Sequence, residues 1–173
     1  MLKLVGALLI LGTCAGVGGW QAWRLRARPR LLAELQAALA LLATQVGYGA
    51  VPLPEALEAV GSGVPAGAAG RLFTEAGQQL RQAQGEPAAK LWRRSVEKWL
   101  PETVLLPEEG EALMRLALGL GEAPREEQLR SIYEVQRRLQ ALEVTARDVS
   151  ERMTKVWSYG GVLTGLAVIV TIW

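Results

Sequence analysis

The sequence predicts an all-α protein: a cytoplasmic bundle of about six helices, flanked by a transmembrane helix at each end. Residues 4–23 and 156–173 contain no charged side chain, whereas the residues between them are rich in charge. In that middle part, apolar residues recur at intervals of three and four, and no run alternates as a half-buried strand does. We therefore divide the chain into an N-terminal anchor at 1–23, a helical domain at 24–155 and a C-terminal transmembrane helix at 156–173.

The first uncharged segment is followed directly by a cluster of arginines. Its twenty residues would span about 30 Å as a helix, which matches the hydrocarbon core of a bilayer. Basic residues flanking a membrane segment stay on the cytoplasmic side, near anionic lipid headgroups. We expect Arg24, Arg26, Arg28 and Arg30 to play this part. A cleaved signal peptide and a buried helix of a soluble protein are the two alternatives.

The last eighteen residues form the second uncharged segment. Arg147, Arg152 and Lys155 precede it, so both segments predict the same orientation, with the middle of the chain in the cytoplasm. A buried core helix is the alternative. Each segment also carries two glycines four residues apart, a spacing that lets membrane helices approach closely. These glycines are Gly12 and Gly16 in the first segment, and Gly161 and Gly165 in the second.

Prolines and glycines divide the middle of the chain into helices, because proline suits a first helical turn and glycine a helix end. Trp92 and Trp99 lie seven residues apart on one predicted face and are expected in the core. The expected helices cover residues 30–46, a second from Pro54, 68–84, 87–100, 107–120 and a last one from Pro124, with residues 61–70 as a loop.

The last predicted helix carries a heptad seam and continues without a break into the C-terminal segment. Its apolar residues are spaced alternately by three and four, as in a coiled coil. The seam packs either on the other helices of its own domain, which we favour, or on a second chain. The seam residues are Ile132, Val135, Leu139, Leu142, Ala146, Val149, Met153 and Val156.

The composition excludes several classes of function. The 19 Lys and Arg residues nearly balance the 17 Asp and Glu residues, so the chain lacks the basic excess of a nucleic-acid-binding protein. It contains no histidine and one cysteine, Cys14, which removes the usual acid–base group and the usual zinc ligands. There is no P-loop, dinucleotide fingerprint or nucleophile elbow. We expect no enzyme activity, no cofactor and no metal.

The first two helices and the turn between them offer a candidate partner contact. Two prolines at alternate positions, Pro52 and Pro54, restrict the backbone of this turn. Glu34 on the first helix, and Glu55 and Glu58 on the second, are on turns that could face one another. The functional interpretation is an acidic contact or a weak cation site. The alternative is that these carboxylates are solvated and stabilise helix starts.

Short motifs in order along the whole chain resemble the stage III sporulation protein AB family. They are Tyr48-Gly49-Ala50-Val51-Pro52-Leu53-Pro54-Glu55-Ala56-Leu57, then Leu118-Gly119-Leu120-Gly121 followed by Gln128, and finally Tyr159-Gly160-Gly161-Val162-Leu163-Thr164-Gly165-Leu166. That family is similar, in its cytoplasmic part, to the F-type platform domain of type II secretion and type IV pilus machines. The F-type proteins usually carry two such domains and three membrane helices, whereas this chain has one domain and two apolar segments.

The resemblance implies a structural part in a channel or secretion-like complex of the mother-cell membrane facing the forespore. Implied partners are a secretion-type ATPase like stage III sporulation protein AA, other membrane subunits of the complex and membrane lipid. The ATPase would dock on the cytoplasmic domain. Self-association of the chain stays open. Two alternative functions also stay open: an F-type platform subunit of a pilus or type II secretion system, and a membrane adaptor that dimerises through its last helix.

Overall fold

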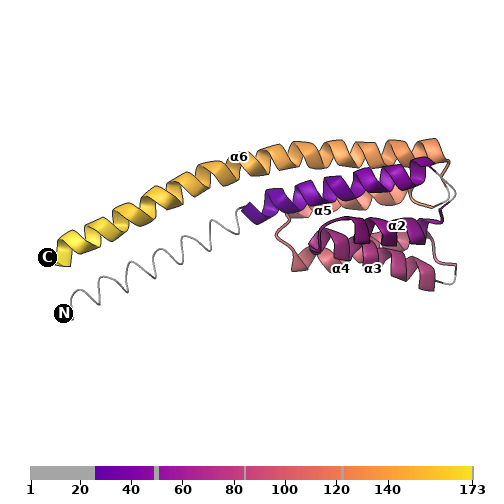
Figure 1. The fold of residues 1–173 in the computed structure, drawn as a ribbon, viewed down its shortest axis with the longest axis horizontal. Helices are drawn as coiled ribbons and strands as arrows, with labels where there is room; N and C mark the ends of the chain where they lie inside the picture. The colour runs from indigo at the N-terminus through magenta and orange to yellow at the C-terminus, as the bar shows by residue number, and fades with distance from the viewer. Residues whose placement is uncertain (1–25, 49–50, 84, 122, 173) are drawn as a thin grey trace. The chain divides into compact units, whose positions relative to one another are not determined.

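The computed structural model describes residues 26–48, 51–83, 85–121 and 123–172, with side chains through Met153. Six α-helices and two short 3-10 helices make up this part, and it contains no strand, so the predicted all-α class is confirmed (Figure 1). The elements are a helix over Arg26–Tyr48, α2 (Leu53–Gly63), α3 (Ala68–Gln82), α4 (Ala88–Trp99), η1 (Leu100–Glu102), α5 (Pro107–Met114), η2 (Arg115–Gly119) and α6 (Arg125–Ile172).

The chain divides into two compact units. One unit is residues 30–144, and the other combines the terminal segments 1–29 and 145–173. The first predicted membrane segment, 4–23, lies outside the described residues. The second, 156–173, is helical in its backbone as far as Ile172. The packing described below is that of the 30–144 unit.

The helix Arg26–Tyr48 supplies one wall of the core. Its leucines at 32, 35, 39 and 42 are fully buried, as their three- and four-residue spacing predicts. Within the part of the chain that the structure describes, this is the one helix long and apolar enough to cross a membrane. Because its leucine face is buried in the unit, we assign it to the core. The Gln36 side-chain amide donates to the Glu143 carboxylate at 2.8 Å and so joins this helix to α6.

Helices α2 and α3 pack against each other through glycines. A methyl group added to Gly77 would lie 2.8 Å from the Pro54 carbonyl oxygen and 2.7 Å from Glu58 Cγ, so only hydrogen fits there. A Cβ added to Gly61 would likewise be too close to its neighbours. It would overlap the Thr74 side chain and lie 2.8 Å from the Gly70 carbonyl oxygen. The two backbones therefore run unusually close.

The predicted loop at 61–70 is wrong for residues 61–63 for this reason, whereas the overlapping prediction of a helix that starts at residue 68 is confirmed. Residues 61–63 belong to α2 and residues 68–70 to α3, which leaves only residues 64–67 outside the helices. The small residues that resemble a flexible linker in the sequence are helical, because the glycines among them sit where two helices touch.

Helix α4 packs through two tryptophans instead. Trp92 is fully buried, and its indole N–H donates to the Leu113 carbonyl oxygen at 2.8 Å. Its ring lies 5.4 Å from the Phe73 ring, centroid to centroid, in a tilted arrangement. Trp99 is 3% exposed and donates to the Ala68 carbonyl oxygen at 2.7 Å. The prediction that both tryptophans belong to the core is confirmed.

The predicted helix at 107–120 is in fact two elements. α5 starts at Pro107 as expected, and the buried Glu109 carboxylate accepts a hydrogen bond of 2.7 Å from the Leu106 N–H. After Met114 the chain tightens into η2, while Leu113, Leu116 and Ala117 stay buried. The 3-10 helix η2 ends at Gly119. A Cβ added to Gly119 would lie 2.5 Å from Ser131 Cβ, so η2 contacts α6 at this glycine.

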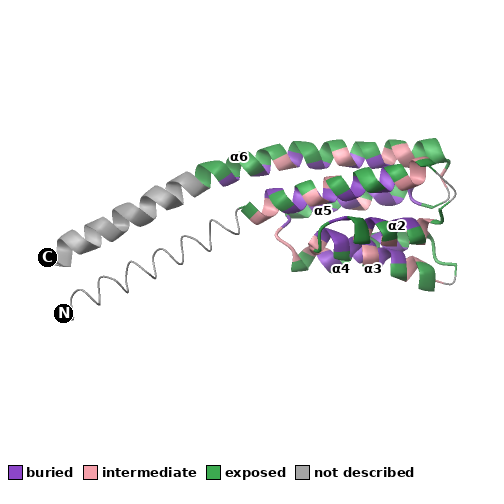
Figure 2. Cartoon of the chain, viewed as in Figure 1, coloured by how far each residue is buried: buried purple, intermediate pink, exposed green. Residues whose placement is uncertain are grey.

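α6 is continuous over 48 residues, as its sequence predicts. The first part of its heptad seam is buried within this chain: Ile132, Val135, Leu139, Leu142 and Ala146 are at most 9% exposed. Val149 and Met153 are 43% and 46% exposed. Figure 2 shows buried residues, in purple, along one side of the first part of α6. The interpretation that the seam packs within its own domain therefore holds as far as Leu142.

Candidate partner-docking surface

Exposed side chains lie at the end of the helix Arg26–Tyr48 and at the start of α2, where two prolines restrict the backbone. Pro52 caps the helix, and its carbonyl oxygen accepts a hydrogen bond of 3.0 Å from the Ala56 N–H. Pro54 lies in the first turn, where its missing N–H costs nothing. Tyr48 is 90% exposed and Val51 is 44% exposed. We call Tyr48, Val51, Pro52 and Glu55 the entry turn; all four are exposed.

The motif that contains the entry turn thus has two halves. Ala56 and Leu57 are buried and hold α2 in the unit. The four entry-turn residues are exposed instead, and packing does not explain a tyrosine that is 90% exposed. Aromatic side chains exposed on a rigid backbone are typical of binding surfaces.

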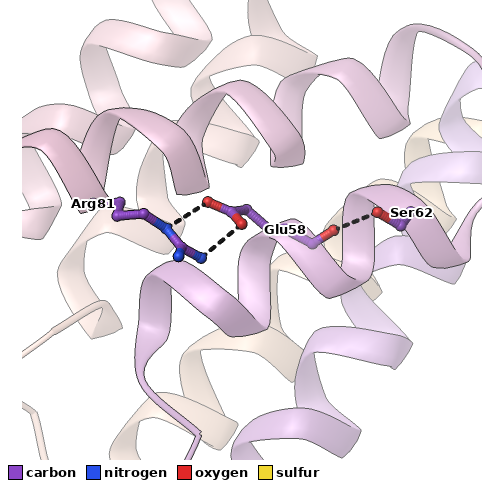
Figure 3. A network of polar contacts seen from close by, with 3 residues as sticks. All are labelled: Glu58, Ser62 and Arg81. Atoms are coloured by element: carbon purple, nitrogen blue, oxygen red, sulfur yellow. Dashed lines mark hydrogen bonds and ion pairs between the residues drawn. The ribbon is translucent and has the colours of Figure 1, made fainter.

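Glu58, predicted as part of an acidic contact, is paired inside the chain. Its carboxylate accepts two hydrogen bonds from the Arg81 guanidinium, at 3.0 and 2.7 Å, and its backbone carbonyl accepts one from the Ser62 hydroxyl (Figure 3). The pair links α2 to α3 beside the close approach at Gly77. Glu58 therefore stabilises the contact between these helices, and its partner Arg81 is too distant in the sequence for spacing to reveal the pair.

Glu34 and Glu55 lie near opposite ends of α2. Glu34 Oε2 is 3.1 Å from the position that a Cβ would take on Gly67, the N-cap of α3. There its negative charge is favourable, because the start of a helix carries a partial positive charge. Glu55 is exposed in the first turn of α2. The three glutamates do not form one acidic cluster, and Glu55 alone belongs to the entry turn.

The other predicted residues fall in several places. Arg26 and Arg30 are exposed and Arg28 is half-buried, whereas Arg24 lies outside the described residues. Gly161 and Gly165 are in the helical backbone of α6, and Gly12 and Gly16 lie outside the described residues. Their expected roles in topology and in membrane packing stay predictions.

Gln128 is hydrogen-bonded to the turn that follows Leu118-Gly119-Leu120-Gly121, which gives a structural reason for the second family motif. Its side-chain amide donates to the carbonyl oxygens of Gly121 at 3.1 Å and Ala123 at 2.8 Å, which ties the turn before α6 to the first turns of that helix. Gly121 has a φ of 102°, which favours glycine. Leu118, inside the same motif, is 76% exposed and lines a groove between η2 and α6 together with Arg115 and Arg130.

In residues 26–48, 51–83, 85–121 and 123–172, no group of three or more His, Cys, Asp or Glu side chains could hold a metal ion. The surface of this part instead offers open grooves and the entry turn. Such features fit contact with another macromolecule better than enclosure of a small ligand.

Comparison with known proteins agrees with this architecture. The family model described as stage III sporulation protein AB matches residues 3–173. Stage III sporulation protein AB of Bacillus subtilis (strain 168) is 29% identical over 170 residues, which are 98% of this chain and 98% of that protein. A solved structure of a stage III sporulation protein AB matches with a TM-score of 0.66 and 27% identity, and covers 72% of this chain and 97% of that chain. Because the family match extends over almost the whole sequence, the chain belongs to the stage III sporulation protein AB family.

Proposed function

We propose that this chain is a non-enzymatic membrane component of a secretion-like channel complex needed for spore development, and that it docks a secretion-type ATPase through its cytoplasmic domain. Family membership supports the part in sporulation. The docking role rests on one observation above all, the exposure of Tyr48 at the end of its helix and of Val51 directly before the prolines of α2.

The part of the entry turn at the start of α2 is suited to docking, because its backbone would lose little conformational freedom on binding. Pro52 and Pro54 limit the backbone, and the buried Ala56 and Leu57 fix the helix that follows. A preorganised surface loses less entropy on association than a flexible one. Glu55 adds a negative charge beside the apolar residues, which favours a partner with an apolar pocket and a cation at its rim.

The continuous α6 supports the membrane part of the proposal. It runs from the folded unit into the uncharged stretch that starts at residue 156, without a loop between them. A partner bound to the bundle would therefore be attached to the membrane segment through a single helix. The expected location is the mother-cell membrane facing the forespore, with the bundle in the cytoplasm.

The test uses the full chain in lipid nanodiscs and the purified ATPase that resembles stage III sporulation protein AA. Titration calorimetry measures binding with and without nucleotide. We expect saturable binding that Tyr48→Ala weakens about tenfold or more, because a central aromatic contact is typically worth over about 1 kcal/mol. Tyr133→Ala is the matched control, since Tyr133 is 49% exposed on α6. Absence of binding, or equal loss in both variants, would remove the docking role from the entry turn.

The adaptor alternative has lost much of its basis. It requires an intermolecular seam along the last helix, but Ile132, Val135 and Leu139 are buried inside this chain. The alternative of a pilus or type II secretion subunit would be favoured by neighbouring genes for pilins rather than for sporulation proteins.

A further inference from the structure

Helix α4 has a cationic face that the entry-turn proposal does not use. Lys90, Arg93, Arg94 and Lys98 are all exposed, with Glu97 as the one anion among the exposed residues of the helix. The opposite face is buried through Leu91, Trp92, Ser95, Val96 and Trp99. The helix is therefore divided into an apolar side that belongs to the core and a solvent side that carries most of its charge. We call Lys90, Arg93, Arg94 and Lys98 the α4 cationic face.

Most of this charge is not neutralised within the described chain. Lys90 pairs with Glu86 at 3.0 Å. No ion pair forms on Arg93, Arg94 or Lys98 with any described residue, whereas Arg81 on the neighbouring α3 is paired with Glu58. A hydrogen bond from Lys90, the Lys90 charge and the charge of Arg94 lower the pKa of the Glu86 carboxyl, so the positive potential acts on the carboxylate beside it.

A groove runs beside these cations and gives them a recognition surface. Arg94 and Lys98 line it together with Gln79, Gln82 and Leu91. Glu86 also lines the groove, and its carboxylate is paired with Lys90. The Gln79 side chain is held by the Ser95 hydroxyl, which donates to its amide oxygen at 3.2 Å. Side-chain amides both donate and accept hydrogen bonds, and they fit the polar backbone and side chains of a peptide.

These features together restrict the kind of partner. A lipid surface is disfavoured, because a membrane-binding helix inserts an exposed apolar face and the apolar face of α4 is buried in the core. A nucleic acid is disfavoured, because both α4 tryptophans are buried, which leaves no aromatic side chain on this face for bases to stack on. An acidic protein segment remains, since it complements the cations and hydrogen-bonds to the groove.

We propose that the α4 cationic face and the adjoining groove are a second docking surface, which binds a glutamate- or aspartate-rich segment of a protein partner. This surface is carried by a different helix from the entry turn and does not depend on binding of the ATPase. Electrostatic complementarity of this kind speeds association and selects among partners, and it weakens as salt increases.

The chain supplies a matched control for the test. It contains two pairs of adjacent arginines, Arg93–Arg94 on α4 and Arg137–Arg138 on α6, and all four side chains are exposed. Arg93→Glu with Arg94→Glu and Arg137→Glu with Arg138→Glu change the net charge equally. The full chain in nanodiscs of zwitterionic lipid is titrated with a fluorescent helical peptide that bears glutamates along one face, and with the same peptide carrying glutamine instead.

We expect the glutamate peptide to bind and the glutamine peptide to bind at least about tenfold more weakly. The α4 double variant should lower affinity at least about tenfold, and the α6 double variant less than about twofold. Arg94→Gln with Lys98→Gln, which adds no negative charge, should also weaken binding. Far-UV circular dichroism before and after heating checks that each variant is folded, and the neutral pair decides the result if the charge reversal unfolds α4.

Three results would overturn the proposal. The first is equal loss of affinity in the α4 and α6 double variants, which indicates unspecific attraction to net charge. The second is equal binding of the two peptides, or no binding of either. The third is binding of phosphatidylglycerol vesicles, lost in the α4 double variant, while the peptide does not bind, which would assign the surface to lipid.

Discussion

Two contacts within the same bundle are built on opposite principles. At the α2–α3 contact, glycines let the backbones approach until no side chain fits between them. At the α4 contact, Trp92 and Trp99 fill the space with the largest side chains available and use their indole N–H groups to bind carbonyl oxygens of other elements. The first contact should fail when an atom is added, and the second when atoms are removed.

The largest effect should come from removing a tryptophan ring. Trp92→Ala leaves a cavity in the core and deprives the Leu113 carbonyl of its donor, so we expect a loss of about 3–5 kcal/mol in the free energy of unfolding. Urea unfolding of the full chain, followed by circular dichroism, measures it. Tyr133→Ala, at an exposed position, should cost less than about 0.5 kcal/mol. A similar cost for both changes would show that the ring is not a core element.

Adding one methyl group should break the other contact. Gly77→Ala places a Cβ against the Pro54 carbonyl oxygen, and we expect destabilisation of about 1–3 kcal/mol from overpacking. Gly47→Ala is the control, because Gly47 is helical and has no atom within 4 Å of the added Cβ. There alanine should stabilise the helix by up to about 1 kcal/mol. The same substitution thus has opposite signs at two helical glycines, and thermal unfolding of both variants tests the difference.

The polar side of the tryptophan contact can be tested with most of the aromatic side chain retained. Trp99→Phe keeps an aromatic ring but removes the N–H that donates to the Ala68 carbonyl oxygen. We expect a loss of about 1 kcal/mol, the typical net worth of one hydrogen bond, because the Ala68 carbonyl keeps its place in α3 and loses only its second donor. If urea unfolding gives the same stability as the parent chain, the indole hydrogen bond makes no net contribution.

The smallest effect concerns the ion pair beside the glycine contact. Glu58→Gln removes one charge from the bidentate pair with Arg81, whose side chain is 55% exposed. Because the pair is partly open to solvent, with the Glu58 side chain 29% exposed, we expect a loss of only about 0.5 kcal/mol, which salt should reduce further. Urea unfolding at low and high ionic strength checks both statements. A loss as large as that of Gly77→Ala would mean that the ion pair, rather than the close approach, determines the α2–α3 contact.

The sequence predicted the elements that depend on local chemistry. The helix starts near Pro54, Pro87, Pro107 and Pro124 agree with the structure within one residue, and the periodic leucines and tryptophans are core residues. The loop predicted at 61–70 is too long, because glycine is frequent both in flexible loops and at tight contacts between helices. The two cases differ in whether a neighbouring helix lies against the glycine, which depends on the tertiary structure.

The candidate site could be predicted only in part. The restricted turn follows from its prolines, but pairing of Glu58 with Arg81 depends on how α2 and α3 cross, since the two residues are 23 positions apart. Sequence spacing placed Glu34 and Glu58 on turns that could face each other. The tertiary structure instead holds one against Gly67 and the other against α3.

The unbroken course of α6 has a consequence for how this chain can change in evolution. Its backbone is helical over 48 residues without a break. One inserted residue turns everything beyond it by about 100° around the helix axis. Insertions in the short loops between the other helices have no such effect. Changes in the length of α6 should therefore be accepted mainly in steps that restore its angular phase, such as about seven or eleven residues.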